Sequence, residues 1–138
     1  MKEVTFVVYG KPRGKARPRM NRHTGSVYTP KATADYEREI RKAYQEAGGG
    51  LFDGVPVAIV VDCYFAPNKA LSKRQKALLR GKWYTHKPDG DNVLKSVLDG
   101  LNGVAYADDA YVVHTSTYKQ YAHDDIARIE VSVREVTR

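Results

Sequence analysis

The chain contains the stretch Lys87-Pro88-Asp89-Gly90-Asp91-Asn92-Val93-Leu94-Lys95-Ser96-Val97-Leu98-Asp99-Gly100-Leu101. Its apolar residues recur at helical spacing and predict a helix from about Asp91 to Leu101 with one buried stripe. Asp91, Lys95 and Asp99 are each four residues apart, so they line another side of that helix. Gly100 is its weak point, because glycine costs about 1 kcal/mol against alanine inside a helix. We therefore expect the helix to close at Gly100 or at Gly103.

Strand and helix patterns flank this helix on both sides. Runs of β-branched and other apolar residues predict four strands, at Val4 to Val8, Val55 to Phe65, about Ala110 to Lys119 and about Ile126 to Val136. Two more helices are expected. One starts near Thr29-Pro30 or at Thr33 and ends at Gly48, and the other runs from Ser72, which pairs with Gln75 as a capping box, to Gly81. This order predicts an α+β fold: a two-layer sandwich with helices packed on a mixed β-sheet, in a single domain over residues 1–138.

Positive charge is concentrated near the start of the chain. The formal net charge is +7, and residues 4–34 alone hold seven Lys or Arg and no acidic residue, while the remainder is balanced in sum. Such a concentration predicts a polyanionic partner, most often nucleic acid; the alternative is a solvated loop that only keeps the protein soluble. Gly and Pro, with a turn at Thr24-Gly25, predict a long exposed loop or a loose hairpin. The residues expected to contact DNA are Lys11, Arg13, Lys15, Arg17, Arg19, Arg22 and Lys87.

Acidic residues occur at two places that suit a metal ion. Asp89 and Asp91 flank Gly90 at a turn just before the helix, and Asp108-Asp109 comes where the next strand begins. Carboxylates brought together repel one another unless a cation compensates, and their hard oxygens suit Mg²⁺ or Mn²⁺. Such an ion activates water and neutralises charge on a leaving oxygen, as hydrolysis of a phosphodiester requires.

The same residues could instead have purely structural roles, and their spacing alone does not decide between these roles and a metal site. Asp89 or Asp91 would make a good helix cap, and Asp108-Asp109 would serve as a solvated turn. Asp91 and Lys95 would form a common surface ion pair worth about 0.3–0.5 kcal/mol. The histidines show no zinc-binding spacing.

Three blocks carry a resemblance to a known family. They are Gly10-Lys-Pro-x-x-Lys-x-Arg-Pro-Arg19, then Lys87-Pro-Asp-Gly-Asp-Asn-x-x-Lys95 with Leu98-Asp-Gly-Leu-Asn-Gly103, and then Asp108-Asp109-x-x-Val112. Together they resemble the RusA family of Holliday junction resolvases, and they cover nearly the whole chain in order. The resemblance implies a Mg²⁺-dependent endonuclease that acts as a homodimer on four-way DNA junctions in DNA recombination and repair. It also implies a bacterial, phage or prophage origin.

The resemblance also assigns roles to particular residues. The family's catalytic, metal-binding aspartates fall on Asp89, Asp91 and Asp109, and its functional lysine falls on Lys95. The expected ion is Mg²⁺, with Mn²⁺ as the alternative. The roles of the remaining aspartates, Asp99 and Asp108, stay open, as does the number of metal ions. Two departures are Gly100, where family members often have Ala, and Ala110-Tyr111, where many have Ser-Gln.

The rest of the composition sets the context. The apolar run from Val4 to Val8 is too short to span a bilayer or to form a signal-peptide core, so no membrane association is expected. Cys63 is the single cysteine and lies in an apolar stretch, which predicts a buried thiol and a cytoplasmic location. No small-molecule cofactor is expected. Rival functions are a nuclease for flaps or nicks, a DNA-binding protein without catalysis, and an RNA-processing nuclease.

Overall fold

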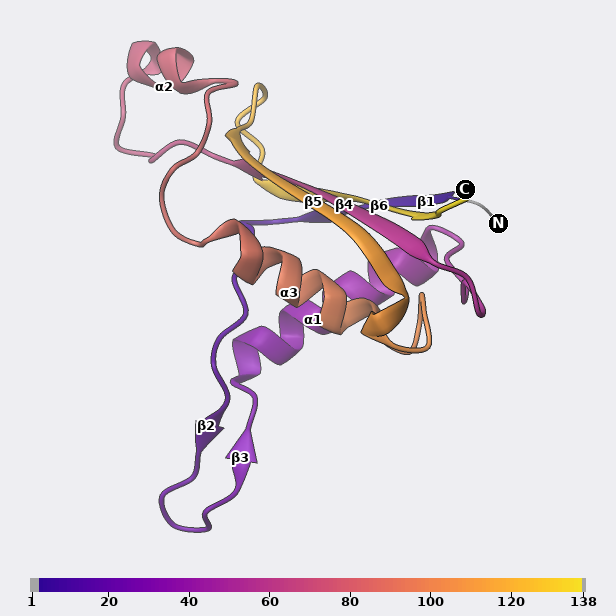
Figure 1. The fold of residues 1–138 in the computed structure, drawn as a ribbon. Helices are drawn as coiled ribbons and strands as arrows, with labels where there is room; N and C mark the ends of the chain where they lie inside the picture. The colour runs from indigo at the N-terminus through magenta and orange to yellow at the C-terminus, as the bar shows by residue number, and fades with distance from the viewer. Residues whose placement is uncertain (1–2, 138) are drawn as a thin grey trace.

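One layer of the structure is a four-stranded mixed sheet (Figure 1). The structure is a computed structural model that describes residues 3–137. The strands are β1 (Glu3–Tyr9), β4 (Val57–Phe65), β5 (Val112–Tyr121) and β6 (Arg128–Glu135), in the spatial order β1-β6-β4-β5. β6 pairs antiparallel with β1 and with β4, whereas β4 and β5 run parallel. Parallel strands need a crossover, and the chain makes it through α2 (Lys73–Leu79) and α3 (Gly90–Leu101).

The second layer consists of α3 and α1 (Lys31–Glu46), which lie side by side beneath the sheet in Figure 1. Alternate strand residues point toward these helices: in β6, Ile129, Val131 and Val133 are buried, as the period of two predicts. Tyr44 of α1 and Val97 of α3 are fully buried against them. The α+β fold class, the mixed sheet and the single domain are therefore confirmed.

Gly100 has a different role from the one that its helix propensity predicts. The helix ends at Leu101, as predicted, and Gly100 lies in its last turn. A Cβ atom at Gly100 would stand 3.0 Å from the carbonyl oxygen of Glu37 and 3.1 Å from a methyl group of Ile40. A larger residue would fit tightly here, so Gly100 favours the close approach of the two helices at this point.

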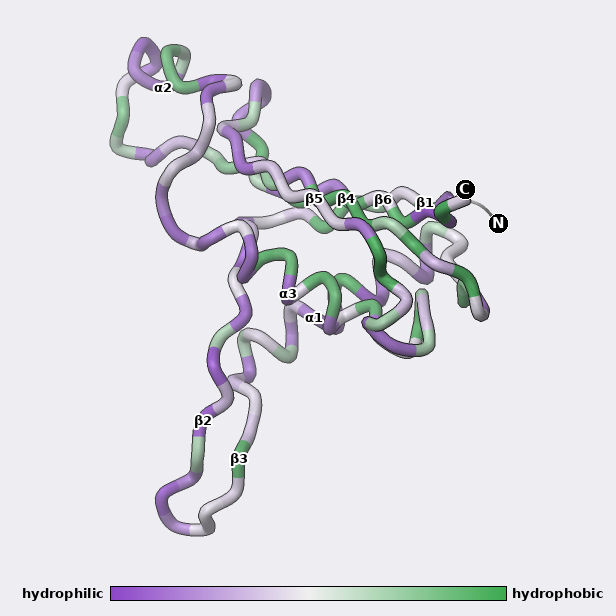
Figure 2. Tube along the Cα trace, viewed as in Figure 1, coloured by the Kyte–Doolittle hydropathy of each residue, from purple (hydrophilic) through white to green (hydrophobic). Residues whose placement is uncertain are grey.

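Two parts of the chain extend away from the sandwich. The first is a hairpin of β2 (Arg19–Met20) and β3 (Val27–Tyr28), which Figure 1 shows projecting below the helices. Gly25 turns the hairpin with φ of 72°, and the predicted loose hairpin is confirmed. The segment that leads into β2 is mainly hydrophilic (Figure 2). The second part is α2, which projects from the opposite end of the molecule (Figure 1).

Element boundaries differ from expectation at one informative place. The strand expected from Ala110 begins at Val112, because Asp109–Tyr111 forms a 3₁₀ turn, η1, ahead of it. The capping box of Ser72 with Gln75 is confirmed at the start of α2. Cys63 is buried as predicted, and burial raises the pKa of its thiol to about 12. Within residues 3–137, no helix is both long and apolar enough to cross a membrane.

Candidate active site

The first turn of α3 presents Asp89 and Asp91 at the surface. Asp89 is the N-cap residue, yet its side chain accepts no hydrogen bond from the helix backbone, so the capping interpretation is wrong for this residue. Asp91 lies one residue inside the helix and is exposed. A Cβ atom at Gly90 would stand 3.6 Å from the methyl group of Thr117, so the start of α3 rests against β5. The positive end of the helix dipole favours the two carboxylates there.

The loop that leads into α3 is fixed to the sheet by Lys119 and Tyr84. Lys119 Nζ donates hydrogen bonds to two loop carbonyl oxygens, His86 at 2.8 Å and Pro88 at 2.7 Å. The backbone N–H of Tyr84 donates to the carbonyl of Lys119 at 2.9 Å. The ring of Tyr84 stacks on Phe65 of β4, with centroids 3.6 Å apart. The sheet thereby sets the position at which the aspartate pair begins.

Lys87 forms an ion pair with Asp89. Its Nζ lies 2.9 Å and 3.0 Å from the two carboxylate oxygens of Asp89. This neighbouring lysine holds the pKa of Asp89 below its usual value, so the carboxylate is ionised at neutral pH. Both side chains are exposed, and an exposed ion pair is weak enough for a cation or a phosphate to displace it.

The basic segment, residues 11–31, packs against the same turn of α3. A Cβ atom at Gly14 would stand 3.1 Å from Cβ of Asn92 and 3.2 Å from Cβ of Pro88. The backbone N–H of Lys15 donates to the carbonyl of Asn92 at 3.0 Å. A groove of about 380 Å³ is lined by Lys15, Ala16, Arg17, Pro18, Asn92 and Lys95. Basic side chains and the aspartate turn therefore share one surface.

Lys15 differs from the other basic residues of this segment. Its Nζ lies 2.7 Å from Asp99 and 3.0 Å from Glu37, and the side chain is only 19% exposed. Burial alone lowers the pKa of Lys15, but the hydrogen bonds and charges of Asp99 and then Glu37 outweigh it and raise the pKa. Lys15 thus ties the segment to α1 and α3. The residues that are exposed, with no carboxylate partner within residues 3–137, are Lys11, Arg13, Arg17, Arg19 and Arg22.

Asp109 lies near the other end of α3. It opens η1, where the carboxylate of the preceding Asp108 accepts a hydrogen bond from the backbone N–H of Ala110 at 3.0 Å. Asp108 therefore caps a turn, which agrees with the interpretation of Asp108-Asp109 as a solvated turn. Partial burial and then the charges of Asp99 and Asp108 raise the pKa of Asp109. Asp109 is accordingly a neighbour of Asp99, whose position along α3 is about 12 Å beyond Asp91 at 1.5 Å per residue.

The three predicted metal ligands are not brought together within one chain. In the part that the structure describes, no three His, Cys, Asp or Glu side chains lie close enough to hold a metal ion. The exposed carboxylates of Asp89 and Asp91 fit a hard cation, since neither is used by the helix backbone. Within the described residues, Asp109 does not join this pair in a three-carboxylate group, and the charges that act on it are those of Asp99 and Asp108.

Lys95 lies one turn beyond Asp91 and is exposed on the wall of the groove. The surface ion pair with Asp91 or Asp99 is absent from residues 3–137, and Asp99 is bound by Lys15 instead. The ion-pair interpretation of Lys95 is therefore wrong. Lys95 presents an unneutralised ammonium group beside the aspartate turn.

Sequence reasoning missed Lys119, Tyr84 and Gly14 as residues of this region. A lysine in a predicted strand and a glycine in a basic loop carry no local signal of their contacts. Only the register of β5 beside the loop places Lys119 at Pro88, and only the docking of the basic segment requires Gly14.

The fold and the site define a small basic α+β protein with a carboxylate pair beside a cationic groove. The family model described as Endodeoxyribonuclease RusA matches residues 9–134. The chain therefore belongs to the RusA endodeoxyribonuclease family, and the resemblance seen in its sequence blocks is confirmed. It is also similar to "Uncharacterized protein YqaN" of Bacillus subtilis (strain 168), with 34% identity over 144 residues that cover 97% of each chain.

Proposed function

We propose that this chain is a Mg²⁺-dependent endodeoxyribonuclease that resolves four-way DNA junctions by paired phosphodiester hydrolysis in recombination and repair. Membership of the RusA family supports a nuclease acting on branched DNA. The observation that carries the proposal is the exposed pair of Asp89 and Asp91, which caps no helix backbone and adjoins a cationic groove. Surface carboxylates placed beside bound phosphates repel them unless a metal ion lies between.

The proposed site divides its work among a few side chains. Asp89 and Asp91 would hold Mg²⁺, or Mn²⁺, with Asp109 as a third ligand. Such an ion would supply an activated water and would offset negative charge on the phosphate. Lys95 stabilises the negative charge that builds up on the phosphate in the transition state. Exposed arginines such as Arg17 and Arg19 hold a duplex arm through its phosphates, contacts that position DNA without reading its bases.

We also propose that the active form is a homodimer. A four-way junction has two-fold symmetry and needs two matched cuts, which a C2 dimer provides with two identical sites. The separation of Asp109 from the Asp89–Asp91 pair supports this arrangement, because a second copy of the chain can bring a third carboxylate to the pair. We place the protein in the cytoplasm of bacteria or of phage-infected cells, with branched DNA as its partner and no small-molecule cofactor.

Cleavage of a panel of labelled synthetic substrates tests the proposal. The panel contains a four-way junction, a flap, a nicked duplex and an RNA duplex, each assayed with Mg²⁺ and with a chelator. We expect Mg²⁺-dependent, symmetrically paired cuts in the junction above all. Preferred cutting of the flap, the nick or the RNA would establish the corresponding rival nuclease. Tight junction binding without any cleavage would establish a non-catalytic DNA-binding protein.

A further inference from the structure

A second region of the chain is as basic as the N-terminal segment. Between Asp62 and Asp89, residues 63–88 contain seven Lys or Arg and no acidic residue. The charge outside residues 4–34 sums to zero only because an acidic remainder offsets this second region. The region includes α2, so its charge is carried by a defined element of the fold.

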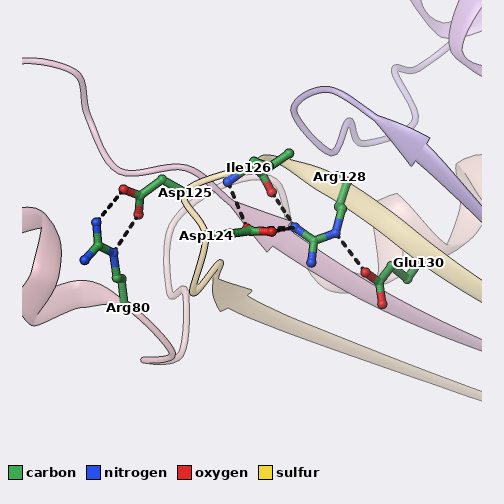
Figure 3. A network of polar contacts seen from close by, with 6 residues as sticks. All are labelled: Arg80, Asp124, Asp125, Ile126, Arg128 and Glu130. Atoms are coloured by element: carbon green, nitrogen blue, oxygen red, sulfur yellow. Dashed lines mark hydrogen bonds and ion pairs between the residues drawn. The ribbon is translucent and has the colours of Figure 1, made fainter.

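The α2 arm, residues 66–82, makes little contact with the rest of the protein. None of the residues of α2 is buried, and even Leu78 is 62% exposed. Its main tie is Arg80, whose Nε and a terminal nitrogen donate to the two carboxylate oxygens of Asp125 at 3.1 Å and 2.8 Å (Figure 3). A second tie runs from the backbone N–H of Gly81 to the carbonyl of Tyr121 at 3.0 Å. The arm is thus held at its base and left uncovered along its helix.

Acidic groups near the arm are already neutralised. Asp125 is bound by Arg80, and Asp124 is bound by Arg128, which also pairs with Glu130 (Figure 3). The other five cations of the arm have no such partners. Within residues 3–137 no carboxylate lies within ion-pair distance of Lys69, Lys73, Arg74, Lys76 or Lys82. Four of these five are exposed, and Lys76 is half-buried.

We infer that the α2 arm is a second DNA-binding surface, which holds the sugar-phosphate backbone of a duplex arm other than the one that the β2–β3 hairpin holds. Unpaired cations on an uncovered helix complement a line of phosphates. Figure 1 shows the arm and the hairpin at opposite ends of the molecule, with α3 between them. The arm also leads directly through residues 83–88 into Asp89. The inference rests on the proposed function, since it adds a contact to the same substrate.

The first test compares the salt dependence of junction binding, measured in chelator so that no strand is cut. The variant Lys69→Gln/Lys73→Gln/Arg74→Gln removes three exposed charges that hold no part of the fold. If each meets a phosphate, the slope of log affinity against log salt flattens by about 2.7 relative to wild type. The matched control, Arg38→Gln/Lys42→Gln/Arg134→Gln, removes three exposed charges outside both basic regions. Its slope should lie within about 0.5 of the wild-type slope.

The second test locates the contact. A photoreactive cross-linker is attached at position 74 in one protein and at position 22 in another, and each is bound to a junction whose four arms are distinguishable by length. We expect positions 74 and 22 to label different DNA arms of the junction. The inference is overturned by an unchanged salt slope in the α2-arm variant, or by labelling of the same DNA arm from both positions. In either case, junction cleavage by the wild-type protein would still support the proposed function. Failure of the wild-type protein to bind branched DNA at all overturns both.

Discussion

The Lys119 ammonium group donates a 2.7 Å hydrogen bond to the carbonyl oxygen of Pro88, the residue immediately before Asp89. A charged donor from the edge strand β5 thus fixes the backbone that carries the first of the proposed metal ligands. Lys119 is a positioning residue in this account, because it contacts the loop and not the substrate.

Lys119→Met should lower the rate of junction cleavage by about 10- to 100-fold, the range typical when a group that orients a metal ligand is lost. The Mg²⁺ concentration for half-maximal rate should rise as well, which a general loss of stability would not cause. Trp83, the single tryptophan, lies in the same loop, so its emission should change in the variant. Lys119→Arg should recover part of the rate, because it keeps donors near the loop carbonyls. A normal Mg²⁺ dependence in Lys119→Met would rule out this positioning role. Lys42→Met, which removes an exposed lysine outside both basic regions, is the control for charge.

Lys15→Met should lower the free energy of unfolding by about 1–3 kcal/mol, since two hydrogen-bonded carboxylates, Asp99 and Glu37, lose their partner. The folded-state pKa of Lys15 lies above its ordinary value of 10.5. Its contribution is therefore fully present below about pH 10.5 and is lost as the pH rises through the folded-state pKa. Urea unfolding of wild type and variant between about pH 8 and 11.5 should show the two stability curves converging only at the alkaline end. Equal stability at pH 8 would show that the tether is not formed.

The hairpin arginines should act on DNA affinity and not on stability. Arg19→Ala/Arg22→Ala removes two exposed charges that have no carboxylate partner within residues 3–137. The slope of log affinity against log salt should flatten by about 2, one counterion for each lost phosphate contact. Filter binding of a four-way junction over a series of salt concentrations measures this. An unchanged slope would mean that the hairpin only keeps the protein soluble.

Local patterns predicted the elements of this fold well, because a helix buries every third or fourth residue and a strand every second. The apolar stripe of α3 and the alternation of Ile129, Val131 and Val133 both depend only on neighbours in sequence. The packing role of Gly100 was not predictable, for the opposite reason. The close packing at Gly100 depends on Glu37 and Ile40, which belong to a helix far away in the chain.

The candidate site was predictable in its residue types but not in its connections. The spacing of Asp89 and Asp91 and the concentration of charge before α1 are visible in the sequence. The partners of Lys15 and Lys119 are not, because both depend on how distant segments pack. The same limit applies to Asp109, since the sequence could not tell that η1 holds it beside Asp99 and away from the aspartate pair.

Lys95 should affect chemistry far more than binding. Because it is exposed on the groove and unneutralised, Lys95→Ala should lower the single-turnover rate of bound junction by about 10²-fold with little change in affinity. Lys95→Arg should rescue poorly, since a planar guanidinium does not replace a compact ammonium. Lys42→Ala, an exposed helix lysine outside the site, is the control. A Lys95→Ala rate within about threefold of wild type would contradict a catalytic role.

The most direct measurement is single-turnover cleavage of a saturated four-way junction by wild type and by Asp91→Asn, in Mg²⁺ and in chelator. Asp91 is exposed and forms no ion pair within residues 3–137, so the amide should leave the fold and junction affinity intact. We predict Mg²⁺-dependent paired cuts by wild type and a loss of at least about 10³-fold in Asp91→Asn, with binding equal to or tighter than wild type because a negative charge beside phosphate is gone. Near-normal cleavage by Asp91→Asn in Mg²⁺ would contradict the metal site and the function built on it.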